Sequence, residues 1–142
     1  MQVQFYPLID QTDTLLRSVV GAVLAGGPVD IVGEEELIDL NYMLTRGQPA
    51  SMLIQVTGDS MCPEIADGDW CILACGVEPK PNQIVVCKLH SGYTIKRFKL
   101  NDARGKRGLF LVPANDDYSP RELLPADEAE IVGTVTSIIK RL

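Results

Sequence analysis

Short apolar segments separated by turn residues run through the chain from residue 51 onward. The segments are rich in Val, Ile, Thr and aromatic residues, which favour strands. Those expected to be strands are Ser51–Thr57, Trp70–Cys75, Gln83–Leu89, Tyr93–Leu100, Gly108–Pro113 and Glu130–Ile139. The connections carry Gly, Pro, Asn and Asp and show no long helical pattern. The sequence therefore predicts a mainly β fold of antiparallel strands forming a partly closed barrel.

The first 33 residues differ from the rest. An apolar patch, Phe5–Leu8, precedes Thr12 and Asp13, which are good N-caps for a helix. Apolar residues then recur at helical spacing at Leu15, Leu16, Val19, Val20, Val23 and Leu24. This pattern predicts an amphipathic helix that does not pass Gly26-Gly27-Pro28.

A second helix is expected to follow. Glu34–Glu36 place acidic side chains in its first turn, where they complement the helix dipole. The apolar positions run from Leu37 to Leu44, and Gly47 is the expected stop.

The charge balance limits the partners of the chain. A net charge of -6 disfavours a protein that binds the phosphate backbone of nucleic acids. No apolar run is long enough to span a bilayer, and the first residues lack the basic region of a signal peptide. The expectation is a soluble, cytoplasmic protein that does not enter membranes.

Cys62, Cys71, Cys75 and Cys87 lack the CxxC spacing of a zinc site, and the chain has a single histidine, His90. The acids at 64, 67 and 69 occur in a turn-rich stretch and are better explained by turn formation than by metal binding. We expect buried or half-buried thiols, no metal and no cofactor.

Ser60 is the candidate nucleophile. It lies in Gly58-Asp59-Ser60-Met61, directly after an expected strand, where backbone N–H groups can stand beside its hydroxyl as an oxyanion hole requires. A serine nucleophile needs a base, and His90 is a poor candidate because it lies in a His-Ser-Gly turn.

Lys96 is the better base. Strand alternation places it on one face with Thr94, Phe98 and Leu100, whereas Arg97 and Lys99 take the other. Burial on an apolar face favours the neutral amine, and only the neutral amine can accept a proton. The alternative is a surface lysine whose stem passes over Phe98.

These motifs together strongly resemble the LexA/UmuD self-cleaving serine peptidases. The resemblance lies in Val56–Pro63, Ile65–Asp69, Tyr93–Arg97 and the Pro-x-Asn segment Leu111–Asn115, followed by Tyr118–Pro120. It covers nearly the whole chain in order. It implies the family's peptidase fold, a catalytic Ser60–Lys96 dyad, and oxyanion contacts from the backbone of Ser60 and Met61.

The resemblance also implies a role for the N-terminal residues 1–25, here called the arm. Val23–Pro28 is similar to the family's cleavage segment, which implies self-cleavage between Ala25 and Gly26. Since a peptidase needs an extended substrate, helix is expected at most up to about Gly21. The implied organisation is a cleavable arm at 1–25, a linker with a short helix at 26–48, and a peptidase domain at 49–142.

Two features favour the UmuD-like branch. The 25 residues before the bond are too few for a helix-turn-helix domain, and Ile38–Asn41 resembles that branch's linker helix. This likeness implies a homodimer of the SOS response to DNA damage that cleaves itself on a RecA–single-stranded-DNA filament. It would then serve a Y-family translesion polymerase (UmuC-like) in SOS mutagenesis, without sequence-specific DNA binding of its own.

Other functions stay open. The chain could be a LexA-related, phage-type or plasmid-type regulator peptidase. From a different class, it could be an interaction module with an inert serine, whose apolar stripe at Leu15, Leu16, Val19 and Val20 would suit a partner groove.

Overall fold

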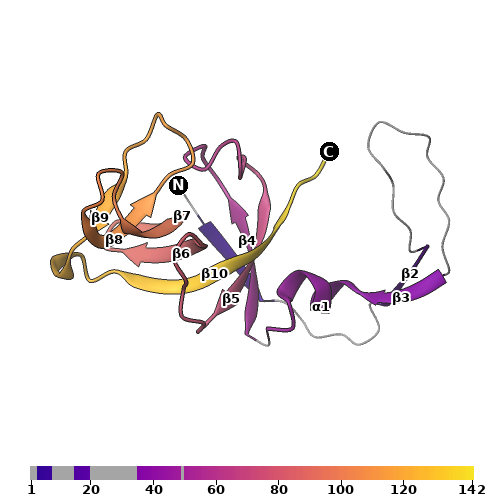
Figure 1. The fold of residues 1–142 in the computed structure, drawn as a ribbon. Coiled ribbons are helices and arrows are strands. Elements are labelled where there is room, and N and C mark those ends of the chain that lie inside the picture. The colour runs from indigo at the N-terminus through magenta and orange to yellow at the C-terminus, as the bar shows by residue number, and fades with distance from the viewer. Residues whose placement is uncertain (1–2, 8–14, 20–34, 49) are drawn as a thin grey trace.

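The computed structural model of the chain describes residues 3–7, 15–19, 35–48 and 50–142. Within these ranges the fold is mainly β (Figure 1). The strands are β1 (Val3–Pro7), β2 (Leu15–Val19), β3 (Glu35–Asp39), β4 (Ser51–Val56), β5 (Trp70–Cys75), β6 (Ile84–Leu89), β7 (Gly92–Asn101), β8 (Arg107–Val112), β9 (Arg121–Leu123) and β10 (Glu130–Ile139). The helices are α1 (Leu40–Thr45) and the 3-10 turn η1 (Pro125–Asp127).

Eight of the described strands form one antiparallel sheet, in the order β1-β4-β5-β10-β6-β7-β8-β9. The last strand, β10, lies in the middle of the sheet and joins its two halves by pairing with both β5 and β6. The mainly β, antiparallel fold predicted from the sequence is confirmed. In the described part of the chain β1 and β9 are end strands without a ladder between them, so the sheet is not closed.

Apolar clusters lie on both faces of the sheet. One apolar cluster includes Ile54, Leu73 and Ile95, and the other includes Phe98 and Leu111. The strand β6 contributes alternate residues to the two clusters: Ile84 and Val86 to the first, and Val85, Cys87 and Leu89 to the second. Burial on both sides explains why β6 is apolar along most of its length.

The helix predicted around residues 14–24 is wrong where the structure describes it. Leu15–Val19 is the strand β2, paired antiparallel with β3. The apolar spacing of this segment suits a helix, but ladder hydrogen bonds from a partner distant in sequence override local preference. In Figure 1 this two-stranded ribbon lies beyond α1, apart from the large sheet.

The second predicted helix begins later than expected. Glu35–Asp39 is the strand β3, and the helix α1 covers Leu40–Thr45. Gly47 follows it with a φ of 71°, as expected for the glycine after a helix end. Among the described residues no helix is long and apolar enough to cross a membrane.

Candidate active site

Ser60 lies in a braced turn after β4. The amide of Gly58 donates to the Asp67 carboxylate at 2.7 Å, and that of Gly68 donates to the Val56 carbonyl at 2.8 Å. Gly58 has a φ of 96°, a conformation that glycine adopts without strain. The end of the turn is therefore bonded back to β4, the strand that precedes it. Ser60 is held in a buried position with 6% of its surface exposed.

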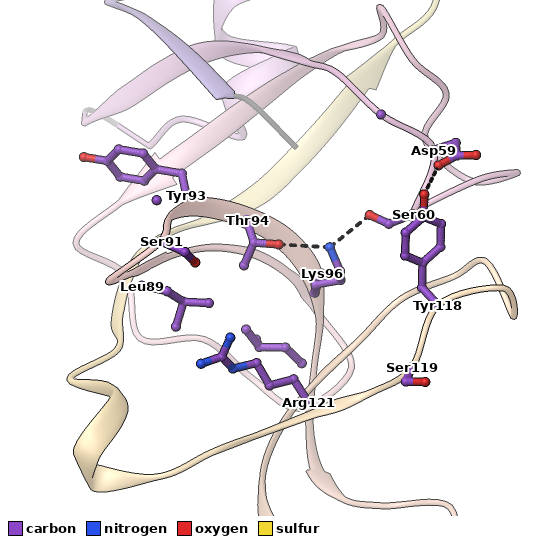
Figure 2. Close-up of a pocket in the computed structure, with 13 residues that line it drawn as sticks. Asp59, Ser60, Leu89, Ser91, Tyr93, Thr94, Lys96, Tyr118, Ser119 and Arg121 are labelled. Atoms are coloured by element: carbon purple, nitrogen blue, oxygen red, sulfur yellow. Dashed lines mark hydrogen bonds between the residues drawn. The ribbon is translucent and has the colours of Figure 1, made fainter.

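Lys96 extends from β7 to this turn (Figure 2). Its Nζ lies 2.9 Å from Ser60 Oγ, 2.9 Å from Thr94 Oγ1 and 3.0 Å from the carbonyl oxygen of Ile95. The predicted pair of side chains is therefore brought together, although 36 residues separate them in sequence.

Burial lowers the pKa of Lys96 below the ordinary value for lysine. Among the ion pairs of the described residues, none involves Lys96. A lysine that loses hydration and gains no carboxylate favours its neutral form. The amine beside Ser60 is thus suited to accept a proton.

The predicted face of β7 is largely confirmed. Lys96 is paired with Val85 across the ladder, and Phe98 packs in the same apolar cluster as Val85. Leu100 is an exception, because it is 42% exposed. The register between β7 and β8 shifts between Lys99 and Asn101, which ends the regular alternation at this point.

The two side chains open into a cleft of about 450 Å³. The turn of Ser60 and the start of β7 line it, together with Leu89, Leu111, Tyr118, Ser119 and Arg121. In Figure 2 the Ser60 hydroxyl points toward the Lys96 amine, and Thr94 lies on the other side of that amine. The cleft gives a peptide access to the serine, and buried Leu89 and Leu111 supply apolar surface near the lysine.

His90 takes no part in this arrangement. It is exposed in the turn between β6 and β7 and does not line the cleft. No hydrogen bond of the described residues links it to Ser60. The geometry favours the lysine over the histidine as partner of the serine.

The four cysteines are buried or half-buried, as expected. Cys71 and Cys87 are buried, Cys62 and Cys75 are half-buried, and all four are free thiols. Burial raises the pKa of Cys71 to about 12, so its thiol stays protonated. In the described part of the chain, no three His, Cys, Asp or Glu side chains are arranged to hold a metal ion.

The three acids after Ser60 each have a partner. Glu64 pairs with Arg97, and Asp67 accepts from Gly58. Asp69 accepts from the Ala66 amide at 2.8 Å and pairs with Lys140. These contacts agree with the interpretation of the acids as turn residues.

Three contacts around the serine were not predicted from the sequence. Thr94 accepts from Lys96, Asn115 bonds to the backbone of the nucleophile turn, and the Tyr118 hydroxyl donates to the Asp59 carboxylate. The Pro-x-Asn motif was the only signal for Asn115, and a motif does not say what its side chain touches.

Ala25 and Gly26 lie outside the described residues. The nearest described strands before and after them are β2 and β3, which are paired with Val19 opposite Glu35.

The family model described as Peptidase S24-like matches residues 18–136. The chain belongs to the S24 peptidase family. The match includes β3, the Ser60 turn and all of β7.

Similar curated proteins are LexA repressors. That of Acidothermus cellulolyticus is 34% identical over 140 residues, covering 96% of this chain and 47% of the repressor. That of Streptomyces avermitilis is 35% identical over 128 residues, covering 87% of this chain and 50% of the repressor. This S24 chain thus spans about half the length of these relatives. They are named as repressors and none as UmuD, so a LexA-related peptidase fits them better than the UmuD-like branch favoured above.

Proposed function

We propose that this chain is a self-cleaving serine peptidase related to LexA repressors, with Ser60 as nucleophile and Lys96 as base. The observation that carries the proposal is the 2.9 Å contact between Lys96 Nζ and Ser60 Oγ at the edge of a cleft. Burial lowers the pKa of that amine. Membership of the S24 peptidase family agrees with this chemistry.

The reaction is acyl transfer. Neutral Lys96 takes the proton of the Ser60 hydroxyl as Oγ forms a bond to the carbonyl carbon of Ala25. The resulting tetrahedral intermediate collapses, the bond from that carbon to the Gly26 nitrogen breaks, and Lys96 returns the proton to the leaving amine. Water then attacks the acyl-enzyme, with Lys96 again as base, and frees Ser60 and the new carboxylate.

The amides of Ser60 and Met61 are the proposed oxyanion donors. Within the described part of the chain, no backbone or side-chain acceptor takes the N–H of either residue. Two preorganised N–H groups beside the nucleophile would stabilise the negative oxygen of the intermediate.

The substrate is proposed to be the chain's own segment around Ala25–Gly26, which makes residues 1–25 a cleavable arm, 26–48 a linker and 49–142 the peptidase domain. The pairing of β2 with β3 supports this assignment, because these two described strands flank the proposed bond in sequence and Val19 lies opposite Glu35. Small residues at the bond let the backbone approach the serine closely. A tethered substrate also has a high effective concentration.

Control of cleavage is proposed to rest on Lys96. The protonated lysine cannot act as a base, and an ammonium loses hydration when a substrate covers the cleft. A partner that favours the closed, neutral state would accelerate cleavage by shifting its population. The RecA–single-stranded-DNA filament implied by the family resemblance is such a partner, and we propose a homodimer as the acting form.

The biological role proposed first is that of a regulator of the SOS response, because the similar curated proteins are LexA repressors. The second is the UmuD-like role in which the processed chain serves a Y-family translesion polymerase. Polymerase pull-down with the processed chain separates the two roles: retention of the polymerase supports the second, and its absence supports the first.

The test of the chemistry is the intact mass of the purified chain after incubation at pH 7 and pH 10. We expect a fragment lacking residues 1–25 to accumulate faster at pH 10, since more Lys96 is neutral there. Ser60→Ala and Lys96→Ala should remain intact, whereas Lys88→Ala, an exposed lysine on the neighbouring strand, should cleave like the parent.

Two outcomes would contradict the proposal. Cleavage that persists in Ser60→Ala would exclude Ser60 as nucleophile. A parent that stays intact at both pH values and with added RecA filament would favour an inert interaction module.

A further inference from the structure

Asn115 holds both carbonyl groups next to the nucleophile. Its side-chain Nδ2 donates to the Asp59 carbonyl at 3.0 Å, and its backbone amide donates to the Ser60 carbonyl at 3.0 Å. The Asp59 carbonyl also accepts from the Cys62 amide at 3.0 Å. One residue, 55 positions further along the chain than Ser60, thus fixes two consecutive peptide groups.

Fixing a carbonyl also fixes the N–H of the same peptide group. In a trans peptide the C=O and the N–H point in opposite directions within one plane. The cis bond in the described residues is Cys62–Pro63, so the groups that join Asp59 to Ser60 and Ser60 to Met61 are trans. With both carbonyls turned toward Asn115, the N–H groups of Ser60 and Met61 point away from it.

We infer that Asn115 is a positioning residue that aims these two N–H groups at the site of the oxyanion. The inference rests on the proposed function, since it assigns a cause to the geometry of the oxyanion donors. Ser60 lines the cleft and Asn115 does not, so Asn115 is assigned a position behind the turn and a role that acts through the backbone of the nucleophile.

Asn115 is itself held in place. Its Oδ1 accepts from the Asp117 amide at 3.0 Å, and its carbonyl accepts from the Tyr118 amide at 3.1 Å. The Tyr118 hydroxyl then donates to the Asp59 carboxylate. The segment 115–118 therefore contacts the nucleophile turn twice, at its backbone through Asn115 and at the Asp59 side chain through Tyr118.

The contacts of Lys96 do not pass through Asn115. They go to Ser60, Thr94 and Ile95. Loss of the Asn115 side chain should therefore lower the rate of reaction at Ser60 without changing the pH at which Lys96 becomes a base. This separation distinguishes an oxyanion role from a general weakening of the fold.

The test compares the full-length parent with Asn115→Ala and Asn115→Ser. The Ser variant keeps a hydroxyl that can accept from Asp117 but cannot reach the Asp59 carbonyl. Asn101→Ala, at the far end of β7, is the matched control. Two rates are measured from pH 6 to 10: self-cleavage, and modification of Ser60 by a fluorophosphonate probe. In that modification Oγ bonds to phosphorus, fluoride leaves, and Lys96 takes the proton.

Both Asn115 variants lose the side-chain bond to the Asp59 carbonyl and keep the backbone bond to the Ser60 carbonyl. Each rate should fall about tenfold to a hundredfold, because a misaligned Ser60 N–H stabilises the transition state less. The midpoint of the pH profile and the melting temperature should match those of the parent and of Asn101→Ala. Parent-like rates in the Asn115 variants, or a rate loss with a shifted midpoint and a lowered melting temperature, would overturn the inference.

The two proposals can fail separately. If the parent reacts with the probe but never cleaves itself, the self-cleavage proposal is contradicted, and the probe rates still decide the role of Asn115. If the parent cleaves and the Asn115 variants cleave equally fast, the Asn115 inference alone is overturned. A parent that neither cleaves nor reacts with the probe would contradict both.

Discussion

The contacts of Lys96 allow both of its protonation states. An ammonium can donate to all three neighbours, Ser60 Oγ, Thr94 Oγ1 and the Ile95 carbonyl. The neutral amine can still donate to the last two, and its lone pair then faces the Ser60 hydroxyl. Because the Ile95 carbonyl can only accept, these contacts orient the lone pair toward the proton that has to move.

Thr94→Val tests this orientation. The substitution keeps the shape of the side chain and removes the acceptor, so the amine is less well oriented. We expect self-cleavage to slow by about tenfold, the effect of one hydrogen bond of roughly 1–1.5 kcal/mol. Thr94→Ser keeps a hydroxyl and should retain most of the rate. Equal rates in Thr94→Val and the parent, measured by intact mass over time, would show that Thr94 does not orient the amine.

At the scale of the elements, the sheet depends on a close approach between β5 and β10. A Cβ built on Gly133 would lie 2.5 Å from the Ala74 carbonyl oxygen and 2.8 Å from Leu73 Cγ. The register between β10 and β6 also shifts between Ile131 and Gly133. Gly133 therefore allows β10 to pass from one half of the sheet to the other.

Gly133→Ala should lower the free energy of unfolding by about 2–3 kcal/mol, because backbone and core atoms would have to move. Gly108→Ala is the control, since the nearest atoms to its added Cβ belong to the Phe110 and Glu122 side chains, at 3.0–3.3 Å, and not to the backbone. The control should lose less than about 1 kcal/mol. Urea unfolding measures both, and equal losses would contradict the proposed tight contact.

The elements also show how much of the secondary structure a local sequence pattern can predict. Six expected strands appear with their ends within about two residues, because alternation and turn residues are local features. Leu15–Val19 was predicted as helix and is a strand. Its ladder partner, β3, lies about twenty residues further along the chain, and local spacing carries no information on such pairing.

The same contrast holds for the site. Ser60 and Lys96 could be proposed from their motifs and from alternation along β7. The bonds of Asn115 to the nucleophile turn could not, because they depend on where β8 ends relative to a loop that precedes it by some fifty residues. The sequence pattern also predicts a helix across residues 34–44. In the structure Glu35–Asp39 is instead the strand β3, because it pairs with β2.

At the scale of the whole molecule, the C-terminal residues are tied to the nucleophile loop. Lys140 pairs with Asp69, a buried acid that also accepts from the Ala66 amide. The Arg141 guanidinium lies 6.0 Å from the centre of the Trp70 ring. Because Asp69 closes the loop that begins at Ser60, the residues that follow β10 help to hold the site.

Asp69 should make the free energy of unfolding depend on pH in the acid range. Burial alone would raise the pKa of Asp69, but the hydrogen bonds from Lys140 and Ala66, with the charge of Lys140, hold it below its ordinary value. The unfolded chain therefore takes up this proton at a higher pH than the folded chain. The stabilisation is present above about pH 4 and is lost as the pH falls through the lowered pKa.

Asp69→Asn tests this contribution. At pH 7 it should cost about 1–3 kcal/mol of unfolding free energy, and its difference from the parent should shrink below about pH 4. Asp116→Asn, an exposed acid, should match the parent throughout. A constant difference between Asp69→Asn and the parent from pH 7 to pH 3, measured by urea unfolding, would exclude the proposed linkage.

The central claim is that neutral Lys96 activates Ser60, and the pH dependence of self-cleavage tests it most directly. We predict that the rate of fragment formation rises with pH and levels off, with a midpoint below the ordinary pKa of lysine. Ser60→Ala and Lys96→Met should give no fragment at any pH. A rate that is flat from pH 6 to 10, or one that persists in Lys96→Met, would contradict a lysine base.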